Sequence, residues 1–177
     1  MRLVSTLLLF TLIACSTEEA KVIEPGFKEE KTFKQLKDSA MIEKNKKWSR
    51  EDKEAIEDFA KRNQLKFKET GSGLHYQIYE EGRGDHPKKG QLLTVNYTVK
   101  LLDGTLVYSS DSLGEASFVL DKEDLESGLH EGMKLLRKGG KGIFVLPYHQ
   151  AHGLTGDNNK IKPLTVVVYN IELNEIE

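Results

Sequence analysis

The sequence predicts an α+β fold in which an antiparallel sheet of five or six strands curls over a single helix. Two observations lead to this class. In the C-terminal two thirds, apolar residues recur mainly at every second position, the period of strands, and only residues 121–138 repeat with the period of a helix. These segments do not alternate as βαβ units, which argues against a parallel sheet. With 177 residues, 38% of them hydrophobic, the chain can form one domain plus an extension.

The N-terminus has the features of an export signal. A mostly apolar run at residues 3–13 follows Arg2, and it is too short to span a bilayer as a mature helix. The run ends in Leu12-Ile13-Ala14-Cys15, which resembles the bacterial lipobox. We therefore predict that residues 1–14 are a lipoprotein signal peptide and that Cys15, the chain's only cysteine, is lipidated. A plain signal peptide with a chance cysteine is the alternative.

A lipid on Cys15 would place the protein in the cell envelope. Ser16 and Thr17 favour sorting to the outer membrane, on its periplasmic face or at the cell surface. Residues 15–30 mix small, charged and Pro-Gly residues without periodicity, which is typical of a tether. The formal charge of -2, with no basic stripe, argues against nucleic-acid binding.

Residues 31–69 are rich in charge and are predicted to form a helical extension. A short helix is expected first, and Ser49, followed by acidic residues, is expected to begin a second one. Ile56, Phe59 and Ala60 form a narrow apolar stripe on this second helix. The stripe is expected to dock on the chain's own domain, with dimerisation through the extension as the alternative.

The domain itself is predicted to cover residues 70–177 and to be organised around a hairpin at residues 92–110. Apolar and polar residues alternate from Leu93 to Leu101, and Asp103-Gly104 supplies the turn. Further strands are expected at residues 74–79, 117–120, 143–146 and 164–173. The helix within residues 121–138 presents one apolar face and stops at Gly139-Gly140, and residues 148–162 form a long polar loop.

Signatures of covalent or metal chemistry are missing from the sequence. It contains no nucleophile elbow, phosphate loop or dinucleotide fingerprint. His130, His149 and His152 lack ligand spacing with carboxylates or cysteines, so we expect no metal site and no cofactor. Asp157-Asn158-Asn159 lacks the offsets of a calcium loop and is expected to form an Asx-type turn. What remains is chemistry that needs only a shaped apolar pocket.

Several motifs, in order and spacing, resemble those of the FKBP-type peptidyl-prolyl cis/trans isomerases. They are Gly73-Leu74-His75-Tyr76, Pro87-Lys88-Lys89-Gly90, Val95-Asn96-Tyr97-Thr98, Leu102-Asp103-Gly104, Ser109-Ser110 and the stretch from Leu125 to Gly132. The resemblance covers about residues 70–175 and implies a five- to six-stranded antiparallel half-barrel wrapped around the helix near residues 125–137. The lipobox, the charged extension and residues 156–161 are similar to the gliding-motility-associated isomerase lipoproteins of Bacteroidetes.

The resemblance implies catalysis of cis/trans isomerisation at X-Pro bonds of unfolded or exported polypeptides, without a cofactor. Rotation about an amide costs about 18–20 kcal/mol because resonance is lost, yet no proton or covalent bond has to move. A dry aromatic pocket that favours the twisted amide over the planar one can therefore act as the catalyst.

Site residues follow from the family's pattern position by position. The resemblance implies catalytic roles for Tyr97 as pocket tyrosine, Tyr169 at the pocket floor and Leu129 at the base. Other positions implied to bind substrate are Val107, Tyr108, Phe118, Leu125, Glu126, His152 and Ile161.

The sequence departs from the family's pattern at five positions of the implied pocket. Val107-Tyr108 replaces a Phe-Asp pair, so the acid that partners the pocket tyrosine is expected to be missing. Glu126 replaces an isoleucine whose amide binds a substrate carbonyl, His152 replaces a tyrosine hydroxyl donor, and Ala116 replaces a phenylalanine. The alternative to an active isomerase is thus an FKBP-like chaperone or assembly module with a weakened pocket.

Overall fold

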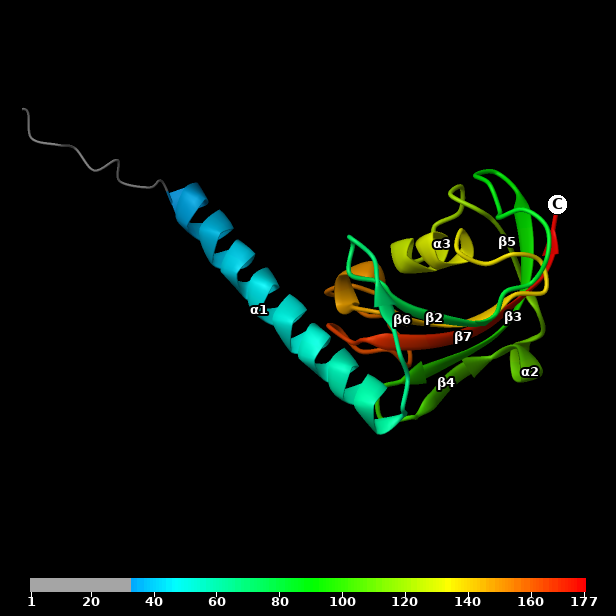
Figure 1. Cartoon of the computed structure of the whole chain (residues 1–177). Coiled ribbons are helices and arrows are strands. Elements are labelled where there is room, and N and C mark those ends of the chain that lie inside the picture. The colour runs from blue at the N-terminus through cyan, green and yellow to red at the C-terminus, as the bar shows by residue number, and fades with distance from the viewer. Residues whose placement is uncertain (1–32) are drawn as a thin grey trace, which may run out of the picture.

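A computed structural model describes residues 33–177, which fold into one long helix, a curved sheet and a short second helix against the sheet (Figure 1). The helices are α1 (Phe33–Arg62), α2 (Ser110–Leu113) and α3 (Ser127–Met133), with a 3-10 turn, η1 (Tyr148–Gln150). The strands are β1 (Lys68–Glu69), β2 (His75–Glu80), β3 (Leu92–Leu101), β4 (Leu106–Ser109), β5 (Ala116–Val119), β6 (Lys141–Leu146) and β7 (Val167–Ile176). The predicted signal peptide, Cys15 and the tether lie outside the described residues.

The strands form one antiparallel sheet in the order β1-β2-β6-β7-β3-β4, with β5 also paired to β3. The long strand β3 organises it, because β3 pairs with β4, β5 and β7. The predicted α+β class and the hairpin at residues 92–110 are confirmed. The sheet has seven strands rather than five or six, because the two exposed residues of β1 also pair with β2.

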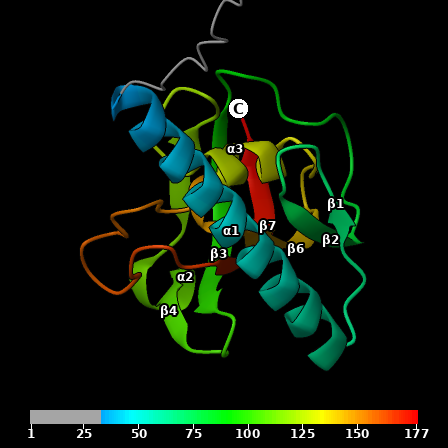
Figure 2. The same ribbon diagram turned by 90° about the vertical axis from the view of Figure 1, so that its left-hand side faces the viewer.

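Helices cover both faces of this sheet. On β6, Phe144 and Leu146 point into the main core with α3, whereas Ile143 and Val145 point to a smaller apolar cluster. That smaller cluster contains Ile56 of α1, which is 1% exposed. The period of two along β6 thus assigns α3 to one face and the C-terminal half of α1 to the other, where α1 crosses the sheet in Figure 2.

The structure corrects both helix predictions. Residues 33–62 form one continuous helix instead of two, because Ser49 lies within the helix and does not cap a new one. Ile56 docks on the chain's own sheet, while the N-terminal half of α1 projects away from the domain and exposes Leu36, Met41 and Ile42 (Figure 1). Among residues 33–177, no helix has the length and hydropathy needed to cross a membrane.

The domain helix is much shorter than predicted and begins only at Ser127. Glu126 has an extended backbone (ψ 131°), and after Met133 the chain continues with tighter bonds from the Leu135 and Leu136 amides to carbonyls three residues earlier. The helix also lies very close to β6, since a Cβ on Gly132 would be 2.8 Å from the Phe144 ring. The helical spacing of apolar residues therefore extends beyond α3, into residues whose side chains are buried like those of a helix face although their backbone is not α-helical.

Candidate active site

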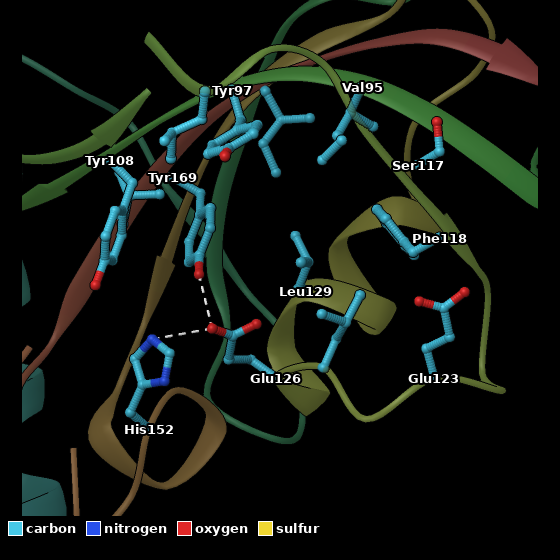
Figure 3. Close-up of a pocket in the computed structure, with 15 residues that line it drawn as sticks. Val95, Tyr97, Tyr108, Ser117, Phe118, Glu123, Glu126, Leu129, His152 and Tyr169 are labelled. Carbon is cyan, nitrogen blue, oxygen red and sulfur yellow. Dashed lines mark hydrogen bonds and ion pairs between the residues drawn. The ribbon is translucent and has the colours of Figure 1, made fainter. Parts of the chain in front are cut away.

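A cavity of about 340 Å³ lies between the sheet and α3 (Figure 3). Its walls are mainly apolar and aromatic. They are formed by Val95, Tyr97, Val99, Tyr108, Leu113, Ala116, Ser117, Phe118, Glu123, Leu125, Glu126, Leu129, His152, Tyr169 and Ile171.

Secondary structure explains why these side chains meet. Alternate residues of β3 place Tyr97 on one face with its neighbours two positions away, and the same period on β7 presents Tyr169. The adjacent strands bring the two tyrosines to the same wall, since Tyr97 pairs with Ile171 in the register of β3 and β7. Leu129 on α3 and Phe118 on β5 close the opposite side (Figure 3).

One carboxylate connects three parts of this site. Glu126 Oε1 accepts a hydrogen bond of 2.9 Å from the Tyr169 hydroxyl and lies 2.9 Å from His152 Nε2 (Figure 3). Burial raises the pKa of Tyr169 well above its ordinary value, and the Glu126 carboxylate adds to this shift. The Tyr169 hydroxyl therefore stays protonated and acts as the donor. Glu126 thereby joins β7 to the start of α3 and to the loop that carries His152.

Residues 148–166, which we call the flap, are also tied to the sheet on the far side of the cavity. Asp157 accepts a hydrogen bond from the Tyr108 hydroxyl of β4, and the amides of Asn159 and Ile161 donate to its other oxygen. Burial acts to raise the pKa of Asp157, but these three donors outweigh it and lower the pKa. The predicted Asx-type turn is confirmed, and it supplies a charged contact that the sequence had not indicated.

Lys160 strengthens the same attachment of the flap. Its Nζ donates to the Val107 carbonyl at 3.0 Å and lies 5.0 Å from the centroid of the Tyr108 ring. The backbone and the side chain of neighbouring β4 residues thus both hold the tip of the flap.

Most of the residues named from the sequence lie around the cavity. Those that line it are Tyr97, Tyr108, Phe118, Leu125, Glu126, Leu129, His152 and Tyr169. Val107 and Ile161 do not: they are 5% and 2% exposed, and both pack into the main core. Ile161 is drawn inward because the Asp157 turn folds the flap tip onto the core.

Other wall residues were not named as site residues. Val95, Val99 and Ile171 share strand faces with Tyr97 and Tyr169, so the period of two could have identified them. Ala116 appeared only as a substituted position. Leu113 ends the short helix α2, Ser117 lies on the four-residue strand β5, and Glu123 lies in the loop that follows, so these segments are too short or too irregular for a periodic signal.

Two acidic side chains accept hydrogen bonds from tyrosines of the site, although the acid expected at the Val107-Tyr108 position is missing. Neither comes from the Val107-Tyr108 position itself. Instead Glu126 and Asp157 reach the tyrosines Tyr169 and Tyr108 from the start of α3 and from the flap. The pocket is therefore ordered by hydrogen bonds different from those expected.

The arrangement can bind an apolar ring beside a carbonyl group. The Glu126 amide, at the N-terminal end of α3, has no hydrogen-bond acceptor among residues 33–177 and so can donate to a ligand. Within the same residues, no group of three or more His, Cys, Asp or Glu side chains is placed to hold a metal ion. The cavity thus offers shape, apolar surface and a few donors.

The comparisons with a family model and with curated proteins point to the same family. The family model of FKBP-type peptidyl-prolyl cis-trans isomerases matches residues 84–174. The chain is 35% identical over 147 residues to the probable isomerase FkpA of Neisseria meningitidis, covering 81% of this chain and 53% of that protein. It is 38% identical over 126 residues to FkpA of Escherichia coli, covering 71% and 45%. The chain thus spans about half the length of the curated relatives that it matches.

Solved structures show the same fold. The crystal structure of FkpA from Escherichia coli superposes with a TM-score of 0.64 at 27% identity, covering 84% of this chain and 74% of that one. The crystal structure of AtFKBP13 gives a TM-score of 0.60 at 26% identity, covering 64% and 100%. The fold, the cavity between sheet and α3, and a family model that matches just over half of the 177 residues together show that this chain belongs to the FKBP-type peptidyl-prolyl cis-trans isomerase family.

Proposed function

We propose that this protein catalyses cis/trans isomerisation of X-Pro bonds in polypeptides. The observation that carries the proposal is the apolar cavity in which Tyr97, Phe118, Leu129 and Tyr169 surround a space of about 340 Å³. A proline ring is apolar and compact, so it can fill the base of such a cavity while the polypeptide on either side remains at the rim.

The mechanism follows from what rotation about an amide requires. The planar amide has a strongly polar, resonance-stabilised bond, and the twisted transition state has lost that charge separation. Apolar walls around the proline disfavour the polar ground state relative to the twisted amide, and this difference lowers the barrier. The free amide of Glu126 can hold a substrate carbonyl while the X-Pro bond turns. No proton transfer or cofactor is needed.

We further propose that the enzyme acts in the cell envelope, anchored by a lipid on Cys15 and serving exported clients. The lipobox at residues 12–15 supports the anchor. We propose a role in gliding motility because the lipobox, the charged extension and residues 156–161 resemble those of gliding-motility-associated isomerase lipoproteins. In cells grown with a palmitate analogue, the wild-type protein is expected to take up the label. It is also expected to sediment with the membrane fraction. The Cys15→Ser variant should take up no label, and an equally labelled variant would contradict the anchor.

A second candidate function is a chaperone or assembly module that holds partners without isomerising them. The exposed Leu36, Met41 and Ile42 on the projecting half of α1 favour it, because exposed apolar side chains on a projecting helix can contact unfolded chains. Suppression of aggregation of a proline-free client, together with absent isomerase activity, would favour this function over catalysis.

The direct test of catalysis is exchange NMR on an Ala-Leu-Pro-Phe peptide. Micromolar wild-type protein is expected to accelerate exchange between the cis and trans signals well above the uncatalysed rate. Leu129→Ala, which removes the base of the cavity, is expected to lower kcat/KM by about tenfold or more. Tyr97→Phe, which keeps the ring, separates the role of the hydroxyl from that of the aromatic surface.

Leu106→Ala is the matched control, because Leu106 is 56% exposed and lies outside the cavity. Its rate should equal that of wild type. Thermal unfolding of each variant checks that the fold is intact. No acceleration by folded wild-type protein would reject the proposed activity, and full activity in both pocket variants would place the catalytic site elsewhere.

A further inference from the structure

The helix α1 makes a buried polar contact with the first residue of the flap. Asp52 Oδ2 accepts a hydrogen bond of 2.8 Å from the backbone amide of Tyr148, across 96 positions of sequence. Asp52 is 8% exposed and Tyr148 5%. Burial raises the pKa of Asp52, while the bond from the Tyr148 amide opposes this rise. Among residues 33–177 the Tyr148 amide is the hydrogen-bond donor to Asp52, so the position of that amide depends on the carboxylate.

Two further contacts surround the same tyrosine. The Trp48 ring packs edge-on against the Tyr148 ring with centroids 6.0 Å apart. The Tyr148 hydroxyl points to Asn45 Oδ1 at 3.4 Å, one helical turn earlier. Asn45, Trp48 and Asp52 have the spacing of one helix face, so α1 holds both the backbone and the ring of Tyr148.

The far end of the flap is also fixed by α1. Val166 packs with Ile56 of the helix in the smaller apolar cluster. Within the flap, the Leu164 amide donates to the Gly153 carbonyl at 3.0 Å, and the Gly153 amide donates to the Tyr148 carbonyl at 2.8 Å. The Tyr148 backbone is therefore bonded through its amide to Asp52 of α1 and through its carbonyl to Gly153, the residue that follows His152.

Two hydrogen bonds and one peptide bond connect Asp52 to His152, which lines the cavity. From Asp52 the connection passes through the Tyr148 backbone to Gly153, which adjoins His152, and His152 pairs with Glu126 in the cavity wall. A change in the position of Tyr148 would move the carbonyl that fixes Gly153 and so shift His152 relative to Glu126. None of these steps requires α1 to contact the substrate.

We propose that Asp52 is a positioning residue of the isomerase site, which holds the flap through Tyr148 so that His152 meets Glu126. The expected change in KM rests on the proposed function, whereas the expected hold of Asp52 on the flap does not. The extension is thereby part of the catalytic unit and does more than connect the domain to a tether.

The kinetic test compares three substitutions on α1. Asp52→Ala removes the acceptor and is expected to raise KM for an X-Pro peptide about five- to tenfold, with a smaller change in kcat. Asp52→Asn keeps an oxygen at the same place and should restore KM to within about twofold of wild type. Asp58→Ala is the control, because Asp58 is exposed and, among residues 33–177, forms an ion pair only with Lys61 of the same helix. An unchanged KM in Asp52→Ala, or equal effects of Asn and Ala, would overturn the inference.

Amide hydrogen exchange provides a readout that does not depend on catalysis. In Asp52→Ala, protection of the Gly153 and Ile161 amides is expected to fall at least tenfold relative to amides of β3 in the same sample, whereas Asp52→Asn keeps it. If Asp52→Ala does not fold, Trp48→Ala is measured in its place, and the same loss of protection is expected. An inactive wild type would reject the proposed function alone, while flap protection equal to wild type would reject the positioning role.

Discussion

Glu126→Ala is expected to lower kcat/KM at least tenfold and to reduce the free energy of unfolding by about 1–3 kcal/mol. The reason is that this carboxylate is the acceptor for Tyr169, whose side chain is only 7% exposed, and also the partner of His152. Its removal leaves a buried hydroxyl without an acceptor and releases the flap from the start of α3. The pocket floor and the flap are then free to move independently, and the substrate meets a wider, wetter cavity.

A double-mutant cycle with Tyr169→Phe tests this explanation. Tyr169→Phe removes the hydroxyl and its need for an acceptor, so it should cost less stability than Glu126→Ala. The two changes together should cost less than the sum of the single ones, with a coupling of about 0.5–3 kcal/mol. Denaturant unfolding measures the stabilities, and peptide exchange NMR measures the activities.

Asp124→Ala is the matched control for this cycle. Asp124 is an exposed carboxylate two residues before Glu126, outside the cavity, so stability and rate should stay at the wild-type values. Strictly additive effects of Glu126→Ala and Tyr169→Phe would show that their hydrogen bond does not order the site.

The sheet could be predicted because each of its long strands has one face in the core. Leu93, Val95 and Val99 are each at most 3% exposed, and their spacing alone identifies β3 and its inward face. The same argument does not extend to β1, since two exposed residues have no detectable period. It overestimates α3, because Leu136 is fully buried beyond the end of the helix and imitates a further helical turn.

The apolar part of the site was predictable for the same reason, and the polar part was not. Tyr97 and Tyr169 are wall residues because strand geometry fixes their direction. By contrast, Glu126 meets Tyr169 across 43 positions, and Tyr108 meets Asp157 across 49. The first pair depends on how the start of α3 meets β7, and the second on how the flap folds back over the sheet, and no local pattern records either. The cavity's shape therefore follows from the sequence more directly than its hydrogen bonds do.

Gly156→Ala is expected to release the flap tip, raising KM at least tenfold and lowering the free energy of unfolding by about 2–4 kcal/mol. Gly156 has φ of +70°, a conformation that residues with a Cβ rarely adopt. A Cβ there would also lie 2.2 Å from the Ile161 carbonyl oxygen, so this backbone has to move. Movement at Ile161 breaks the turn in which Asp157 accepts from the Ile161 amide, and with it the contact of Asp157 with Tyr108.

Gly153→Ala separates strain from steric conflict, because Gly153 has a similar φ of +62° but open space where its Cβ would be. It should cost only about 1–2 kcal/mol, the ordinary penalty of a left-handed backbone, and should leave KM within about threefold of wild type. Peptide exchange NMR gives KM, and denaturant unfolding gives the stabilities. If the two alanine variants behaved alike, backbone conformation alone would account for both, and closure of the flap tip by Asp157 and Tyr108 would have no separate role in substrate binding.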